Sequence, residues 1–242
     1  MIEFQNVSKI YNSNEAPVHA LKDVSLTIAE GEFVALMGPS GSGKSTLLTI
    51  LGGMNSPSAG RVLIDGIDVY ALSSEKQADF RHEYIGFVFQ QLQLLPYLTA
   101  LENVLLALAI SPMHRAEKAS LAREALARVG LKGKEGRFPY QLSGGEQGRV
   151  AVARAVVNQP PVLLADEPTG NLDRATGEQV LGLLRELNRS GQTVIMVTHD
   201  SQAAAYAGRI VNILDGQIVT ESVPSLACVV DTASLALAAV NR

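Results

Sequence analysis

A glycine-rich segment near the start of the chain has the spacing of a phosphate-binding loop. Residues 38–46 read GPSGSGKST and fit the pattern G-x-x-x-x-G-K-[ST]. Glycines allow successive backbone N–H groups to point at phosphate oxygens, and the N-terminus of the following helix adds partial positive charge. We expect Lys44 to reach the β- and γ-phosphates and the Ser45 hydroxyl to hold Mg²⁺. The segment therefore predicts a nucleoside triphosphate site.

The expected phosphate contacts come from Gly38, Ser40, Gly41, Ser42, Gly43, Lys44, Ser45 and Thr46. Four further polar residues stand where predicted apolar strands end: Gln90, Asp166, Glu167 and His199. Asp166 is expected to complete the Mg²⁺ site with Ser45, and Gln90 to bridge the metal and the attacking water. Glu167 is suited to act as the general base, and His199 to bond the γ-phosphate.

A second anion-binding candidate lies much later, at the start of a predicted helix. It comprises Leu142 followed by Ser143, Gly144, Gly145 and Glu146. The helix from Gly145 to Val157 would be about 20 Å long, and its far end leads into the strand that carries Asp166. Its N-terminus therefore points away from the chain's own nucleotide. Either Ser143 is a plain helix cap, or this site serves the nucleotide of a second subunit in a head-to-tail pair.

The elements that position these residues alternate between strands and helices. Strands are predicted at Glu32–Met37, Tyr84–Gln90, Val162–Ala165 and Thr193–Thr198, and a β pair at Ile210–Leu214 and Gln217–Thr220. Helices are predicted at Thr46–Leu51, Leu101–Ile110, Arg115–Val129, Gly145–Val157 and Thr176–Arg189. Such alternation favours an α/β fold with a mostly parallel sheet covered on both faces, and ligands then bind at the carboxyl ends of the strands.

Two regions depart from this alternation. Residues 1–30 contain short β segments, and Arg61–Ile64 and Asp68–Tyr70 flank a turn at Asp65–Gly66, which indicates a hairpin. Residues 91–158 are predicted to form a helical insertion within the α/β core.

Composition limits the classes of function that remain. The 242 residues carry a net charge of −4, and aromatic residues make up 5% with no tryptophan, so neither a nucleic-acid footprint nor a base-stacking platform is expected. The single cysteine, Cys228, excludes an internal disulfide. No signal peptide and no uninterrupted apolar run of about 18 residues is present. We therefore expect a soluble chain whose membrane role, if any, depends on a partner.

Taken together, these motifs resemble those of the ATP-binding subunit of ABC transporters. In order they are the P-loop at Gly38–Thr46, the Q-loop glutamine Gln90, the signature Leu142–Glu146, the Walker B strand Val162–Asp166 with Glu167, the D-loop Asn171–Asp173 and the switch histidine His199. The resemblance implies a P-loop NTPase core of the RecA-like type, an N-terminal antiparallel β subdomain and an inserted helical subdomain. It covers residues 1–221, whereas residues 222–242 form a tail with no family motif.

Three further sequence segments are similar to those of the macrolide-export and lipoprotein-release branch of the family. The relevant segments are 18–21, 94–104 and 165–173. The resemblance implies ATP and Mg²⁺ as ligands, Tyr11 stacked on adenine, and a homodimer that forms on ATP binding. It also implies a separate integral membrane permease at the cytoplasmic face of a bacterial inner membrane, further periplasmic or outer-membrane components reached through that permease, and no nucleic acid.

The permease is expected to dock beside Gln90, in a groove lined by Leu92, Leu94, Leu95, Tyr97 and Leu98. Several alternatives stay open: a cell-division regulator that moves no cargo, a soluble ABC ATPase acting on DNA or ribosomes, or an unrelated P-loop kinase or GTPase. One departure from the family pattern is Gly148, where a polar residue is usual. A glycine early in a helix costs about 1 kcal/mol relative to alanine.

Overall fold

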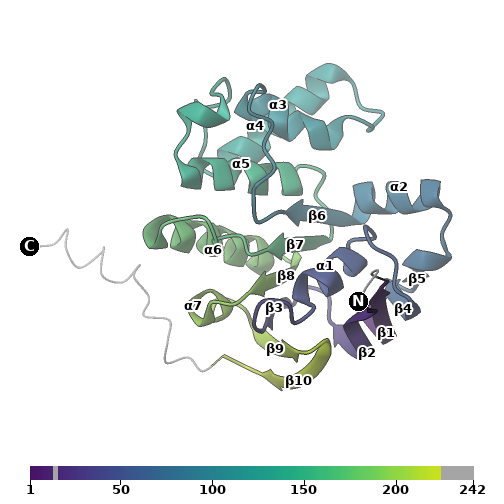
Figure 1. Cartoon of the computed structure of the whole chain (residues 1–242). Coiled ribbons are helices and arrows are strands. Elements are labelled where there is room, and N and C mark those ends of the chain that lie inside the picture. Colours follow the sequence, from purple (N-terminus) through teal and green to yellow (C-terminus); the bar gives the residue numbers. More distant parts are fainter. Residues whose placement is uncertain (13–15, 225–242) are drawn as a thin grey trace, which may run out of the picture.

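A six-stranded sheet forms the centre of the molecule (Figure 1). The computed structural model describes residues 1–12 and 16–224. Five strands are parallel neighbours in the order β9 (Arg209–Leu214), β3 (Phe33–Met37), β8 (Thr193–Thr198), β7 (Val162–Asp166) and β6 (Ile85–Val88). The sixth, β10 (Gln217–Ser222), pairs antiparallel with β9 at one edge. The prediction of an α/β fold with a mostly parallel sheet is confirmed.

Alternate residues of the central strands enter two separate hydrophobic cores. In β3, Val34 and Leu36 pack in the core that contains α1 (Lys44–Leu51), whereas Phe33 and Ala35 pack in the core of the later helices. Because side chains alternate along a strand, two apolar faces require a continuous apolar run. All four of these β3 residues are buried.

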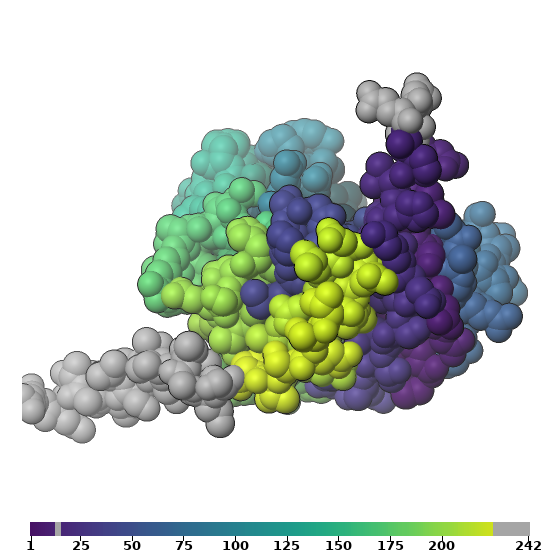
Figure 2. Space-filling view, turned by 60° about the horizontal axis from the view of Figure 1, so that its bottom comes forward, coloured from purple at the N-terminus to yellow at the C-terminus, as the bar shows by residue number. Residues whose placement is uncertain are grey.

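A second, antiparallel sheet packs beside α1. Its order is β2 (Val18–Ile28), β1 (Ile2–Tyr11), β4 (Ala59–Ile64) and β5 (Ile67–Asp68). Buried residues such as Phe4, Leu26 and Val62 line the face shared with the α1 core. The end of the β1–β2 pair stands out from the body of the molecule (Figure 2).

The later helices cover the opposite face of the central sheet. They are α3 (Ala100–Leu105), the 3₁₀ turn η2 (Leu106–Leu108), α4 (Arg115–Arg128), α5 (Gly144–Val156), α6 (Arg174–Arg189) and the short α7 (Ser201–Ala204), with a further 3₁₀ turn η3 (Pro139–Gln141) before α5. Capping boxes begin α3 at Thr99 and α5 at Ser143, which satisfies backbone N–H groups that a helix start leaves free. In Figure 1, α3, α4 and α5 form a layer of their own above the sheet. The domain limits 91–158 and 1–221 remain a prediction.

One helix has no counterpart among the predicted elements. Helix α2 (Ser74–Tyr84) begins after Ser73, whose hydroxyl accepts a bond from the Lys76 N–H. Its sequence is largely polar and only Phe80 is buried, so no apolar periodicity marks it. Tyr84 consequently ends this helix rather than starting β6.

The predicted hairpin is present but shorter than expected. Its second strand is only Ile67–Asp68, and the chain then enters the 3₁₀ turn η1 (Val69–Ala71), capped by the Asp68 carboxylate.

The tail prediction falls mainly on residues 225–242, which lie outside the described residues. Within residues 1–12 and 16–224, no helix is long and apolar enough to cross a membrane.

Alanine substitutions at two glycines of α5 are expected to change the stability of the fold in opposite directions. A Cβ at Gly148 would lie 3.4 Å from Val180 Cγ2 and 3.6 Å from Leu172 Cδ1, which is ordinary contact. Gly148→Ala should therefore stabilise the fold by about 1 kcal/mol through helix propensity, which raises the Tm by about 2–4 °C in a chain of this size. Thermal unfolding measures this. A lower Tm would show that Leu172 and Val180 cannot accommodate the methyl group.

The matched control is the neighbouring position Gly145. A Cβ there would lie 2.2 Å from Thr176 Cγ2, so the Thr176 side chain or the helix that carries it would have to shift. Gly145→Ala should lower the Tm, although its helix propensity changes in the same direction as at Gly148.

Candidate active site

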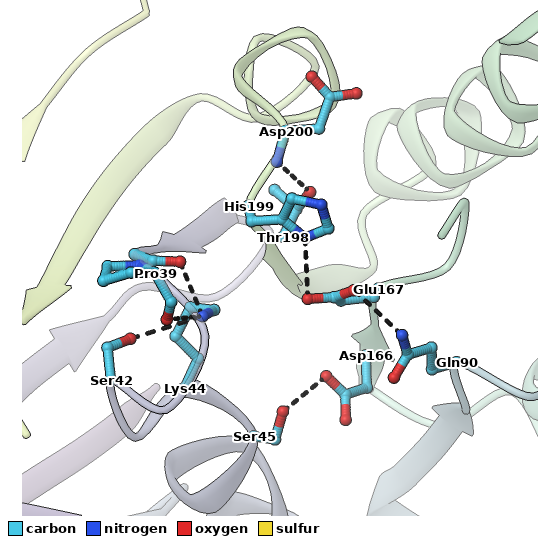
Figure 3. A network of polar contacts seen from close by, with 11 residues as sticks. Pro39, Ser42, Lys44, Ser45, Gln90, Asp166, Glu167, Thr198, His199 and Asp200 are labelled. Atoms are coloured by element: carbon cyan, nitrogen blue, oxygen red, sulfur yellow. Dashed lines mark hydrogen bonds and ion pairs between the residues drawn. The ribbon is translucent and has the colours of Figure 1, made fainter. Parts of the chain in front are cut away.

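The polar residues predicted at strand ends meet at one edge of the central sheet. Lys44 and Ser45 begin α1, directly after the loop that follows β3. Strand β7 ends at Asp166 with Glu167 next, and His199 follows β8. Gln90 follows β6. Because these strands are parallel, their carboxyl ends share an edge, and Figure 3 shows the side chains gathered there.

The loop between β3 and α1 is held tightly against its surroundings. Gly43, the residue before α1, has a φ of 100°, and a Cβ there would lie 2.3 Å from the Ala20 carbonyl oxygen. Only glycine tolerates both conditions. Within the loop, Ser42 is buried whereas Ser40 and Gly41 are exposed, and Ser45 in the first turn of α1 is exposed as well.

Lys44 is a buried cation whose charge is not matched by an ion pair. Its ammonium group donates to the Gly38 and Pro39 carbonyls, at 2.8 Å each, and lies 3.5 Å from Ser42 Oγ. Burial lowers the pKa of Lys44, and the Glu167 and Asp166 carboxylates partly oppose this. No ion pair among the described residues includes Lys44. A cation held in this way fits a phosphate group.

Ser45 and Asp166 form an oxygen-rich pair facing that cation. Ser45 Oγ donates to Asp166 Oδ1 at 3.0 Å. Burial raises the pKa of Asp166, as does the neighbouring Glu167, while the Ser45 hydrogen bond and Lys44 lower it. Hydroxyl and carboxylate oxygens are the ligands that Mg²⁺ prefers, and it binds few of them when phosphates complete its shell.

Glu167 is the centre of the polar network in Figure 3. Gln90 Nε2 donates to its Oε2 at 3.1 Å, and His199 Nδ1 lies 3.0 Å from its Oε1. The backbone of Glu167 is left-handed, with a φ of 43°, and its N–H donates to the Val197 carbonyl at 3.0 Å. Left-handed residues other than glycine cost about 1–3 kcal/mol and persist where surrounding contacts hold them.

A cavity of about 470 Å³ opens on the His199 side of this carboxylate. Its lining comprises Glu167, Thr169, Gly170, Thr198, His199, Asp200 and Ser201. Thr198 and Asp200 brace the histidine segment, because the Asp200 N–H donates to Thr198 Oγ1 at 3.0 Å. The arrangement offers Glu167 an open approach for a water molecule.

Two sets of predicted site residues lie apart from this network. Ser143 and Glu146 cap α5 reciprocally, and Lys134 also donates to Glu146, which lowers the pKa of that carboxyl. Helix α5 packs against α3, α4, α6 and β6, whereas α1 packs against β2, β7 and β8. The signature residues therefore lie in a different layer from the P-loop.

Tyr11 occupies the exposed end of β1. Its hydroxyl accepts a hydrogen bond from Asn55 Nδ2 at 2.5 Å, and the Lys9 ammonium lies 5.0 Å from the ring centroid. No hydrogen bond among the described residues joins Tyr11 to the P-loop. Its stacking on adenine remains a prediction.

Two contacts of the site could not be predicted from the sequence. Asn171 Nδ2 donates to the Gln90 carbonyl at 3.1 Å, which ties the D-loop to the Q-loop. Lys134 reaches Glu146 across a turn. Such pairs depend on how distant loops meet, and neither spacing nor periodicity encodes that. Of the residues expected to line the permease groove, Leu92 and Leu94 are partly buried against the hydrophobic core.

Comparisons with known proteins agree with this geometry. Residues 21–170 match the family model described as ABC transporter. The lipoprotein-releasing system ATP-binding protein LolD of Geobacter metallireducens is 48% identical over 222 residues, covering 91% of this chain and 99% of that protein. The macrolide export ATP-binding/permease protein MacB of Escherichia coli is 46% identical over 222 residues, covering 92% of this chain but 34% of that longer protein. The resemblance to this branch is confirmed.

A solved structure has the same fold. It is described as the dimeric structure of a post-hydrolysis state of the ATP-binding cassette MJ0796 bound to ADP and Pi, and MJ0796 is a protein of Methanocaldococcus jannaschii. It is 46% identical with a TM-score of 0.85, covering 93% of this chain and 99% of that one. The predicted fold class is thereby confirmed.

The raised pKa of Asp166 predicts a stability cost that depends on pH. A carboxyl whose pKa is higher in the folded than in the unfolded state destabilises the fold when it ionises. Asp166→Asn keeps an acceptor for Ser45 and should raise the Tm of the nucleotide-free protein near neutral pH. The difference from the parent protein should shrink as the pH falls toward about 4. Thermal unfolding across this pH range measures it.

Asp173 provides a control of opposite sign. Its carboxylate caps α6 by accepting from the Thr176 N–H, and hydrogen bonding to the side chain and then the backbone of Thr176 lowers its pKa. Asp173→Asn should therefore lower the Tm near neutral pH, and that difference should also shrink on acidification. Equal changes in Tm for Asp166→Asn and Asp173→Asn would contradict the inference that folding raises the pKa of Asp166 and lowers that of Asp173.

Proposed function

The chain belongs to the ABC transporter family and is an ATP-binding, ATP-hydrolysing subunit, and we propose that its closure around ATP–Mg²⁺ drives a separate membrane permease. The observation that carries this proposal is the convergence of Lys44, Ser45, Asp166, Glu167 and His199 at one edge of the sheet. A phosphate cradle, an oxygen pair for a cation and a carboxylate open to water are the parts that phosphoryl transfer requires.

The P-loop residues bind and orient the triphosphate. Lys44 exchanges its bonds to the loop carbonyls for the β- and γ-phosphate oxygens, while the exposed N–H groups of the loop contact the same oxygens. Ser45 and Asp166 would hold Mg²⁺, with Gln90 as a further oxygen ligand. When bound, the metal neutralises phosphate charge.

Glu167 supplies the base for hydrolysis in this proposal. Its carboxylate accepts a proton from the attacking water, and His199 and Gln90, which contact its two oxygens, set its orientation. Two polar side chains on one carboxylate also reduce its freedom to rotate, so the base stays aimed at the edge of the sheet.

The signature residues act on the nucleotide of a second copy. Ser143 begins a helix of 13 residues, about 20 Å long, whose other end connects to β7 and thus to the chain's own site. The start of this helix is an anion site that its own nucleotide does not reach. Two chains arranged head to tail with two-fold symmetry bring each signature to the partner's P-loop. The related MJ0796 cassette, described as dimeric, supports this arrangement.

The proposed setting is the cytoplasmic face of a bacterial inner membrane, where the subunit is held by its permease. The named relatives support a role in export, lipoprotein release or force transmission, with periplasmic or outer-membrane components reached through the permease. A cell-division regulator with the same kind of membrane partner is the second candidate.

A groove between α2, β6, η2 and the end of α5 is the proposed docking place of the permease. It has a volume of about 380 Å³ and is lined by Arg81, His82, Ile85, Gly86, Phe87, Leu106, Ala107, Arg154, Ala155 and Asn158. Leu106 is 43% exposed at its rim, and Tyr97 and Ile110 are 70% and 68% exposed on nearby segments. No acidic residue lines the groove, so it suits an apolar segment that carries a carboxylate.

The composite site predicts that two defective subunits complement each other. Lys44→Ala removes the phosphate-binding cation, and Ser143→Arg blocks the signature. In each homodimer both sites contain one defect, whereas the mixed dimer has one site with both defects and one with none. In a Glu167→Gln background, which should retain bound ATP, the mixture should trap about one ATP per dimer.

The parent Glu167→Gln protein, expected to trap about two ATP per dimer, is the control. Normal hydrolysis by this parent would remove Glu167 from the role of base. If mixed dimers form but trap no ATP, the composite site is wrong and Ser143 is only a helix cap.

The groove predicts a variant that separates catalysis from membrane association. Leu106→Asp places a charge on the apolar rim and should release the subunit from its permease, because burying that charge is costly. The isolated subunit should hydrolyse ATP at the parent rate. Co-purification from native membranes and steady-state hydrolysis measure the two properties.

Val219 on β10 is a matched control, since it is 53% exposed and distant from the groove. Val219→Asp should retain the permease. Loss of the permease by both variants, or by neither, would refute the groove as the docking place.

A further inference from the structure

A partly buried arginine of the signature helix holds the backbone that follows Gln90. Arg154 lies near the C-terminal end of α5. Its Nη1 donates to the Gln93 carbonyl and its Nη2 to the Leu92 carbonyl, both at 2.6 Å. These bonds join residues about sixty positions apart, and they are the short, charge-assisted kind.

The backbone that Arg154 holds is strained. Leu92 and Gln93 are consecutive left-handed residues, with φ angles of 56° and 50°. The Leu92 N–H donates to the Phe89 carbonyl at 2.9 Å, and the Gln93 N–H to the Gln91 carbonyl at 2.5 Å. Neither residue is a glycine, so this conformation requires an external restraint.

Arg154 has no acidic partner among the described residues that would otherwise explain its partial burial. None of the ion pairs within residues 1–12 and 16–224 includes it. Partial burial lowers its pKa. The cost of partly burying this cation is offset by hydrogen bonds, and the carbonyls of Leu92 and Gln93 in the left-handed turn accept both of them.

We propose that Arg154 is the positioning residue of Gln90: its fork holds the left-handed turn at Leu92 and Gln93, and so keeps Gln90 at Glu167. The turn begins directly after Gln90, whose side chain lies 3.1 Å from Glu167 Oε2. Because Arg154 and Ser143 belong to one helix, the signature and the Gln90 turn move as one body. Arg154 also lines the permease groove, so a segment that enters the groove meets the group that sets Gln90.

Arg81 separates this role from a general effect of groove charge. It lines the same groove and also donates to a backbone carbonyl, that of Gly53, at 3.0 Å. That carbonyl follows α1 and is not part of the Gln90 turn. Arg81→Gln is therefore the matched control for Arg154→Gln.

Amide hydrogen exchange of the isolated, nucleotide-free subunit tests the restraint directly. In Arg154→Gln, exchange in the segment 89–95 should accelerate by about tenfold or more, because charge-assisted bonds that resist opening are lost. Arg81→Gln should leave this segment unchanged. Equal exchange in the two variants would overturn the proposal. Arg154→Lys serves if Arg154→Gln does not fold, since an ammonium keeps the charge but lacks the planar fork that places one N–H group on each carbonyl.

Steady-state kinetics test the link to Gln90. Arg154→Gln should lower kcat by about tenfold and leave KM for ATP within about twofold, since Lys44 and Ser45 are untouched. A parallel fall in Tm and rise in KM would indicate a structural role and overturn the proposal. This readout rests on the proposed role of Gln90, whereas hydrogen exchange does not, so faster exchange with normal kcat would refute the role of Gln90 alone.

A second substitution tests the strain itself. Asparagine adopts the left-handed conformation more readily than glutamine. Gln93→Asn by itself should keep kcat within about twofold, and in the Arg154→Gln background it should restore part of the lost kcat. If it restores nothing, the strained turn is not what Arg154 maintains.

Discussion

The active site depends on one constraint, the common direction of β3, β6, β7 and β8. These strands are parallel neighbours, so the residues that follow them are delivered to one edge of the sheet. The strands are apolar on both faces because each face is covered by its own core. Burial of the sheet thus fixes the edge at which Lys44, Asp166, Glu167 and His199 meet.

That edge carries charges which work against the stability of the nucleotide-free fold. Lys44 and Asp166 are both partly removed from water, and the pKa of each moves in the direction that disfavours its charged form. Glu167 adds a left-handed backbone. Phosphates carry charge opposite to Lys44, and Mg²⁺ carries charge opposite to Asp166. Binding of both therefore offsets the cost of the charges that have no partner in the nucleotide-free fold.

Helix α5 connects features that lie far apart along the chain. Ser143 of the signature caps its start, Gly145 and Gly148 in its first turns face α6, and Arg154 near its end contacts the turn after Gln90. A helix transmits displacement along its axis better than a loop does, since its backbone hydrogen bonds hold its length. The proposed contacts with the partner nucleotide and with the permease thus fall on one rigid element.

The sequence by itself determined the P-loop, the four strand-end residues, the fold class and the family, because each of these depends on local spacing or on apolar runs. The tertiary structure alone decided that Gln90 and His199 contact opposite oxygens of Glu167, and that Arg154 reaches Leu92 and Gln93. Helix α2 was not predicted because its residues are largely polar and show no apolar periodicity. Arg154 stands inside an apolar run, which marks it as unusual, but its acceptors are backbone carbonyls of a distant turn. Any residue type supplies a carbonyl, so only the path of the folded chain selects which ones an arginine meets.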